Sequence, residues 1–121
     1  MCRIGTLPSP VDAAAFARQA GAVLGTAIRL SGGGEIRRVA VCGGSGGDFI
    51  EMLAGQADLF LTGEVKHHQW LAAEESGIAV AEAGHYATEQ PVVGTLCRWL
   101  TQAFPALSVI AYDDGAPYAT V

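Results

Sequence analysis

The stretch Val39-Ala40-Val41-Cys42-Gly43-Gly44-Ser45-Gly46-Gly47 decides the fold. Small and β-branched apolar residues in series, bounded by glycines, are typical of a strand that is buried on both faces. The glycine run after Cys42 predicts a tight turn, and a helix is expected directly behind it, over residues 48–54. A strand that passes through a short turn into a helix is the repeating unit of a parallel α/β sheet.

The rest of the chain repeats this alternation. Strands are expected at residues 37–42, 58–62 and 78–81, and we expect segments 39–41, 59–61 and 78–80 to be buried neighbours in one sheet. The remaining expected elements are helices over 11–24, 65–76 and 92–103, a short strand over 26–30, a loop over 31–34 and a closing strand over 107–112. Ser9 or Pro10 is expected to begin the first helix and Gly25 to end it. The pattern predicts a single α/β domain over residues 1–121, with a largely parallel sheet and covering helices.

Composition excludes several classes of protein. The chain has 121 residues, half of them apolar and 16% charged, which fits one globular domain and excludes an intrinsically disordered chain. The net charge of −5 gives no bulk attraction to nucleic-acid backbones, so direct nucleic-acid binding is not expected. No apolar run approaches the length of a membrane-spanning helix, and a membrane partner is not expected either.

Three widely separated cysteines, Cys2, Cys42 and Cys97, form no CxxC pair. Their odd number and spacing indicate neither a disulfide framework nor a zinc knuckle. We therefore expect a reducing, cytoplasmic setting.

The connection between the expected strand over 78–81 and the expected helix over 92–103 contains the motif Gly84-His85-Tyr86-Ala87-Thr88-Glu89. Such junctions are where open α/β sheets place their chemistry. His85 and Glu89 are four residues apart, so on a helix they would share one face and could form half of a divalent-metal site. The alternative is a solvated surface pair with no ligand.

A second junction, Thr62-Gly63-Glu64-Val65-Lys66-His67-His68, follows the strand over 58–62. Glu64 and His68 are also four residues apart and are expected at the same sheet edge as His85 and Glu89. The plain alternative is a helix start with Glu64 near the positive end of the helix dipole. Two such imidazole and carboxylate pairs at neighbouring strand ends predict a mixed nitrogen and oxygen site for zinc, manganese or iron.

The glycine turn at residues 43–47 allows two interpretations. A glycine turn that opens a helix can bind a phosphate group through backbone N–H groups. Asp48 and Phe49 follow the second glycine pair, however, where a P-loop has lysine and serine or threonine. A tight turn that lets helix and sheet approach closely is the favoured interpretation.

Three ordered motifs resemble the C-terminal half of the NIF3-like family, whose members are also described as GTP cyclohydrolase 1 type 2 homologues. They are the segments 39–46, 57–68 and 83–89, and residues 3–8 are similar to the family's entry into this half. The resemblance implies a NIF3-like lobe in which His85 and Glu89 are metal ligands, while Glu64 and His68 line the site as proton-transfer groups. It further implies metal-dependent hydrolysis of a nucleotide-like substrate, or alternatively a structural module of a homo-oligomeric, even hexameric, ring.

The chain departs from the family pattern in one respect. Family members supply further ligands from an N-terminal half, through an adjacent histidine pair followed by proline and through an aspartate, and this sequence has no counterpart. The pair His67-His68 follows the Thr-Gly-Glu motif and precedes Gln69. Because a catalytic zinc normally keeps three protein ligands, we expect His85 and Glu89 alone to bind metal weakly.

Overall fold

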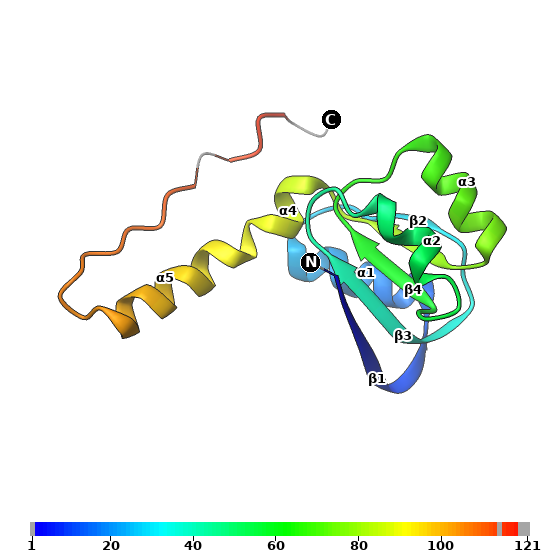
Figure 1. Cartoon of the computed structure of the whole chain (residues 1–121), viewed down its shortest axis with the longest axis horizontal. Coiled ribbons are helices and arrows are strands. Elements are labelled where there is room, and N and C mark those ends of the chain that lie inside the picture. Colours follow the sequence, from blue (N-terminus) through cyan, green and yellow to red (C-terminus); the bar gives the residue numbers. More distant parts are fainter. Residues whose placement is uncertain (1, 114, 119–121) are drawn as a thin grey trace.

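A five-stranded mixed sheet with helices on both faces forms the body of the protein (Figure 1). The computed structural model describes residues 2–113 and 115–118. The strands are β1 (Arg3–Asp12), β2 (Arg29–Ser31), β3 (Glu35–Cys42), β4 (Leu59–Thr62) and β5 (Ala79–Glu82). The helices are α1 (Ala13–Leu24), the 3-10 turn η1 (Gly47–Phe49), α2 (Ile50–Leu53), α3 (His67–Ser76), α4 (His85–Glu89) and α5 (Pro91–Ala103).

The three central strands are parallel neighbours, as the sequence predicted. The sheet order is β1-β3-β4-β5-β2, with β1 and β2 antiparallel at the two edges. Ala40, Phe60 and Val80 stand opposite one another in register, and each is completely buried. Two residues depart from the expected burial: Val41 is 41% exposed, and Leu61 is only partly buried.

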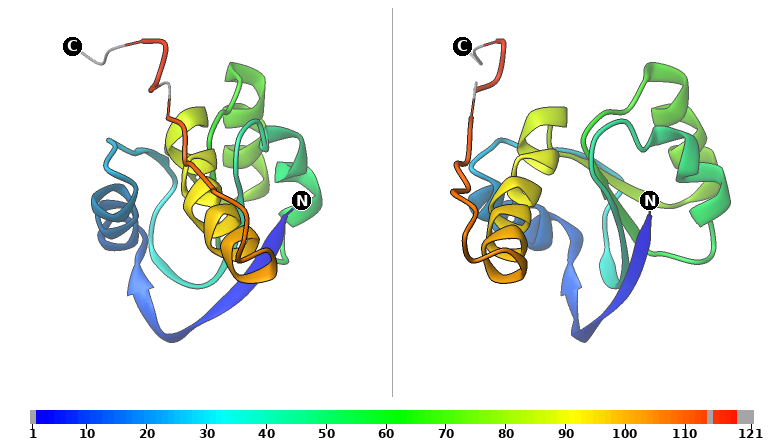
Figure 2. Two further views of the ribbon diagram at one scale, coloured as in Figure 1. Left: turned by 90° about the vertical axis from the view of Figure 1, so that its left-hand side faces the viewer. Right: turned by 60° about the vertical axis from the view of Figure 1, so that its left-hand side comes forward.

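Each face of the sheet has its own apolar cluster. Ile50 and Leu53 of α2, together with Ala73 of α3, pack with Phe60 and Val80 on one face. On the other face, Ala13 of α1 packs with a set of strand residues, namely Ile36, Val39, Leu59, Ala79 and Ala81. Figure 2 shows α1 on one side of the sheet and α2 and α3 on the other. No helix in the described residues is long and apolar enough to cross a membrane.

The N-terminal segment was predicted wrongly. Arg3–Asp12 forms an edge strand, and Pro8 and Pro10 lie within it, beside a register shift between Thr6 and Val11. Proline is tolerated there because an edge strand leaves one side of its backbone unpaired. Helix α1 therefore begins at Ala13, where the Asp12 side chain accepts the Ala15 N–H at 2.9 Å, and not at Ser9 or Pro10.

Other boundaries shifted. The short strand expected over 26–30 forms at Arg29–Ser31, where it pairs with β5. The helix expected over 48–54 is a 3-10 turn followed by α2, and the helix expected from residue 65 begins at His67. Gly25 does end α1, in the left-handed conformation at φ 67°. Helix α5 spans Pro91–Ala103, one residue longer at its start than expected.

The closing strand expected over residues 107–112 does not form. This segment is extended but pairs with no strand in the described part of the chain. An apolar run of this kind specifies a strand only where a sheet edge is within reach. Here the preceding helix α5 leads away from the sheet (Figure 1), so the segment has no edge beside it.

We expect Phe60→Ala to lower the free energy of unfolding by about 3–5 kcal/mol, because it leaves a cavity in the fully buried centre of β4. Urea denaturation would measure the loss. Val23→Ala is the matched control, since Val23 is 80% exposed on α1 and should change stability by no more than about 0.5 kcal/mol. Equal losses in the two variants would contradict the assignment of the core.

Candidate functional site

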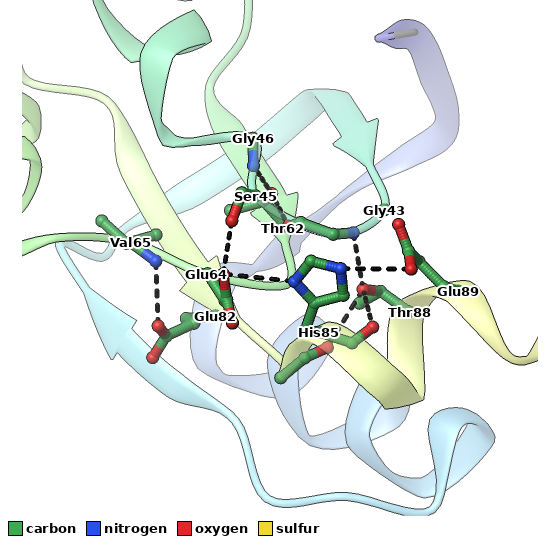
Figure 3. Close-up of polar contacts among 12 residues, drawn as sticks. Gly43, Ser45, Gly46, Thr62, Glu64, Val65, Glu82, His85, Thr88 and Glu89 are labelled. Carbon is green, nitrogen blue, oxygen red and sulfur yellow. Dashed lines mark hydrogen bonds and ion pairs between the residues drawn. The ribbon is translucent and has the colours of Figure 1, made fainter. Parts of the chain in front are cut away.

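Glu64, His85 and Glu89 gather at the edge of the sheet where β4 and β5 end (Figure 3). His85 lies between the two carboxylates: its Nδ1 is 3.2 Å from Glu64 Oε2, and its Nε2 is 3.1 Å from Glu89 Oε2. Glu64 belongs to the loop after β4, whereas His85 and Glu89 are the two ends of α4. The adjacent parallel strands thus bring together residues that are 21 positions apart in the sequence.

Close approach of three backbone segments makes this cluster. A Cβ atom at Gly44 would lie 2.5 Å from Glu89 Oε1, and one at Gly63 would lie 2.6 Å from the Gly44 carbonyl oxygen. The Gly44 N–H donates to Thr88 Oγ1 at 3.0 Å, which ties the glycine turn to α4. Only glycine fits where these segments meet. The interpretation of the 43–47 turn as a close-packing device agrees with these contacts.

Charge in the cluster is shared through hydrogen bonds. The Ser45 hydroxyl donates to Glu64, and this bond, together with His85, lowers the pKa of the Glu64 carboxyl. Glu64 in turn raises the pKa of His85, and Glu89 adds to the effect. All three side chains of the cluster are about half exposed, at 55%, 42% and 57% for Glu64, His85 and Glu89. Protonated His85 therefore neutralises one of its two carboxylate neighbours.

The donors match a divalent metal in type but not in number. Imidazole nitrogen and carboxylate oxygen suit zinc, manganese or iron. Within residues 2–113 and 115–118, however, no group of three His, Cys, Asp or Glu side chains is arranged to hold an ion. His85 and Glu89 thus form a pair of candidate ligands, with Glu64 on the far nitrogen of the same imidazole.

The two expected proton-transfer residues separate in the structure. Glu64 contacts His85 directly, as the strand-end argument required. His68 is exposed on α3, and it lines neither hollow that Glu64 borders. The i,i+4 relation between them fails because residue 64 precedes the helix, which begins at His67.

Glu82 supports the site from the end of β5, and sequence analysis did not identify it. Its side chain is buried at the end of β5, where Oε1 accepts the Val65 N–H at 2.9 Å and Oε2 pairs with Arg29. The Arg29 guanidinium also lies 5.8 Å from the centre of the Trp70 ring. Because Val65 follows Glu64, Glu82 fixes the loop that carries Glu64 toward His85. Spacing gave no signal for this role, since Arg29 comes from the distant β2.

Comparison with known proteins assigns the chain to a family. The model of the family described as Duf34/NIF3 (NGG1p interacting factor 3) matches residues 1–117, and the chain belongs to this family. A curated relative from Pseudomonas aeruginosa, called a GTP cyclohydrolase 1 type 2 homolog, is 39% identical over 103 residues, which are 84% of this chain and 41% of the relative.

Solved structures agree with this assignment. Protein ybgI, described as of unknown function, is 34% identical with a TM-score of 0.78 over 84% of this chain and 42% of its own. A Bacillus cereus protein related to NIF3 is 24% identical and shares the fold, with a TM-score of 0.83 over 100% of this chain and 36% of its own. The chain thus spans less than half the length of these relatives.

The Glu64–His85 pair should make stability depend on pH. The raised pKa of His85 gives a contribution that is present below the unfolded value, about 6.5, and is lost as pH rises through the folded pKa. The lowered pKa of Glu64 gives a contribution that is present above its unfolded value, about 4.3, and is lost as pH falls through the folded pKa.

We therefore expect Glu64→Gln to destabilise the protein most between about pH 4.3 and pH 6.5. Urea denaturation of both proteins across pH 4 to 9, on the order of one measurement per pH unit, would trace the difference. Glu51→Gln, at an exposed position of α2, is the control. If the difference in unfolding free energy between the wild type and Glu64→Gln stays constant with pH, Glu64 and His85 do not interact electrostatically.

Glu82→Ala should free the loop after β4, because it removes the acceptor of the Val65 N–H and the partner of Arg29. We expect a loss of about 1–3 kcal/mol in unfolding free energy and faster hydrogen exchange at the Val65 amide. Glu82→Gln keeps an acceptor oxygen and should retain most of the protection. Glu74→Ala, at an exposed position of α3, serves as the control. Unchanged Val65 exchange in Glu82→Ala would remove the positioning role.

Proposed function

We propose that this chain supplies half of a divalent-metal centre of the NIF3 type, and that the complete centre hydrolyses a nucleotide-like substrate. The observation that carries this proposal is the row of carboxylate, imidazole and carboxylate formed by Glu64, His85 and Glu89. The Gly-His-Tyr-x-x-Glu motif at residues 84–89 supports it through the family resemblance. Zinc, manganese and iron are the candidate ions.

Each residue of the row has a role in this proposal. His85 Nε2 and Glu89 Oε2 are already neighbours and would hold the ion, which supplies an activated water when bound. Glu64 on His85 Nδ1 holds the imidazole ring in place, as carboxylates beside metal-bound histidines do. Glu64 can also accept a proton at the site, with Ser45 stabilising its charged form. His68 would contribute only after a movement that brings α3 closer.

A second candidate function is that of a structural module in an oligomer. Helix α5 has no buried residue in the described structure, and such an apolar helix favours an association role. In this alternative the metal supports assembly of a cytoplasmic homo-oligomer, up to a hexameric ring, and no hydrolysis occurs.

Metal binding is the first test. We expect the isolated chain to bind fewer than two zinc or manganese ions, weakly, in equilibrium dialysis, because a pair of ligands leaves the other coordination positions to water. His85→Ala should abolish this binding, and Glu89→Gln should weaken it. His67→Ala is the matched control on the exposed start of α3. Tight binding of two ions by the wild-type chain would contradict the half-site, and equal binding by His85→Ala would remove His85 from it.

Activity separates the two candidate functions. A panel of nucleotides is incubated with the metal-loaded chain while oligomer mass is measured with and without chelator. Hydrolysis that His85→Ala abolishes supports the enzyme. Loss of the oligomer in chelator, with no hydrolysis of any nucleotide, supports the structural module instead.

A further inference from the structure

Two of the three cysteines lie opposite each other in the sheet, although they are far apart in the sequence. Strand β1 runs antiparallel to β3, with Arg3 opposite Val41. Continuing this register by one residue places Cys2 opposite Cys42. Figure 1 shows the start of β1 beside the end of β3. Because opposed residues of an antiparallel pair point to the same face, both thiols leave the sheet on one side.

Both thiols also share their surroundings. Cys42 belongs to the apolar cluster that α2 and α3 cover, and the partly buried Cys2 packs against that cluster. Burial raises the pKa of the Cys2 thiol, and the nearby Cys42 raises it further. Backbone N–H groups of Arg3 and Val41 act on this pKa in the opposite direction, so the Cys2 sulfur lies against the backbone of β3. The third cysteine, Cys97, lies on α5, which leads away from the sheet.

The spacing of the two strands suits a covalent bond between these thiols. Opposed residues of an antiparallel pair have Cα atoms roughly 4.5–5.5 Å apart, and a disulfide spans roughly 4.4–6.8 Å between Cα atoms. Rotation of the side chains is therefore enough to join them, with no movement of the backbone. In the structure both cysteines are free, and Cys42 donates its S–H to the Gly43 carbonyl oxygen at 3.6 Å. An S–H group is a weak donor, so a disulfide replaces this hydrogen bond with little loss.

We propose that Cys2 and Cys42 are a reversible disulfide pair, which a low-molecular-weight disulfide oxidises. This inference is independent of the proposed metal centre. The more exposed Cys2 attacks, as its thiolate, one sulfur of the small disulfide RSSR, so that a mixed disulfide with Cys2 forms and RS⁻ leaves. The Cys42 thiolate then attacks the Cys2 sulfur and expels the second RS⁻. The two cysteines have then lost two protons and two electrons, and RSSR has become two molecules of RSH.

This bond secures an edge strand that is otherwise held loosely. Most of β1 is exposed, and its register with β3 shifts between Thr6 and Val11. Segments with few buried contacts open most readily, and a cross-link over the long loop between residues 2 and 42 opposes that opening. Cys42 also ends the strand that leads into the glycine turn at residues 43–47. The redox state of the pair therefore determines how firmly the base of that turn is held.

The test is oxidation of the full chain in glutathione buffers, with Cys97→Ser as the background so that two thiols remain. Intact mass and peptide mapping should show the loss of two hydrogen atoms and a peptide cross-linked between Cys2 and Cys42. The raised pKa keeps the Cys2 thiol protonated at neutral pH, so the bond should form faster as pH rises. At half oxidation, the ratio of squared reduced glutathione to oxidised glutathione should be about 30-fold or more higher for the folded chain than for the chain in urea.

Thermal unfolding gives a second measurement. The oxidised Cys97→Ser chain should unfold about 10 °C above its reduced form. Cys2→Ala in the same background, treated identically, is the matched control and should show no rise. A chain that gains glutathione but forms no bond between Cys2 and Cys42 overturns the proposal, as does a bond that forms as readily in urea. Oxidation that lowers the unfolding temperature also overturns it, because the bond would then strain the register of β1 on β3.

Discussion

The backbone of Gly44 makes the contacts on which the site depends. Its carbonyl oxygen accepts the N–H groups of Gly63 and Glu64 at 2.9 and 3.1 Å, and its own N–H donates to Thr88 Oγ1 at 3.0 Å. The two peptide groups that flank this one residue thereby join the ends of β3 and β4 to helix α4. A side chain at this position would push the Glu89 carboxylate aside, and the positive φ of 67° is a backbone conformation that favours glycine.

From this junction the electrostatics of the cluster follow. Glu64 and Glu89 are held on opposite nitrogens of His85, which favours the charged imidazolium. Glu82 also stabilises the arrangement. Its carboxylate accepts the N–H of Val65, the residue after Glu64, and so fixes the backbone next to Glu64. Backbone hydrogen bonds at Gly44 and at Val65 thus support the cluster. The cluster also borders a hollow that lies beside α5.

The candidate ligands lie beside helix α5, on which four apolar side chains are exposed, namely Val92, Leu96, Trp99 and Leu100. A pair of metal ligands and an uncovered apolar helix are separate observations, yet helix α5 begins two residues after Glu89. The chain spans less than half the length of the solved relatives.

The sequence alone determined the parallel core of β3, β4 and β5 and the pairing of His85 with Glu89, because apolar runs and short spacings are local signals. Motif resemblance extended this to the family that the comparisons then established. Only the tertiary structure decided that Arg3–Asp12 is an edge strand, that Glu64 rather than His68 meets His85, and that residues 107–112 find no sheet. These outcomes depend on which distant edge or loop lies within reach, and that depends on long-range packing rather than on local pattern.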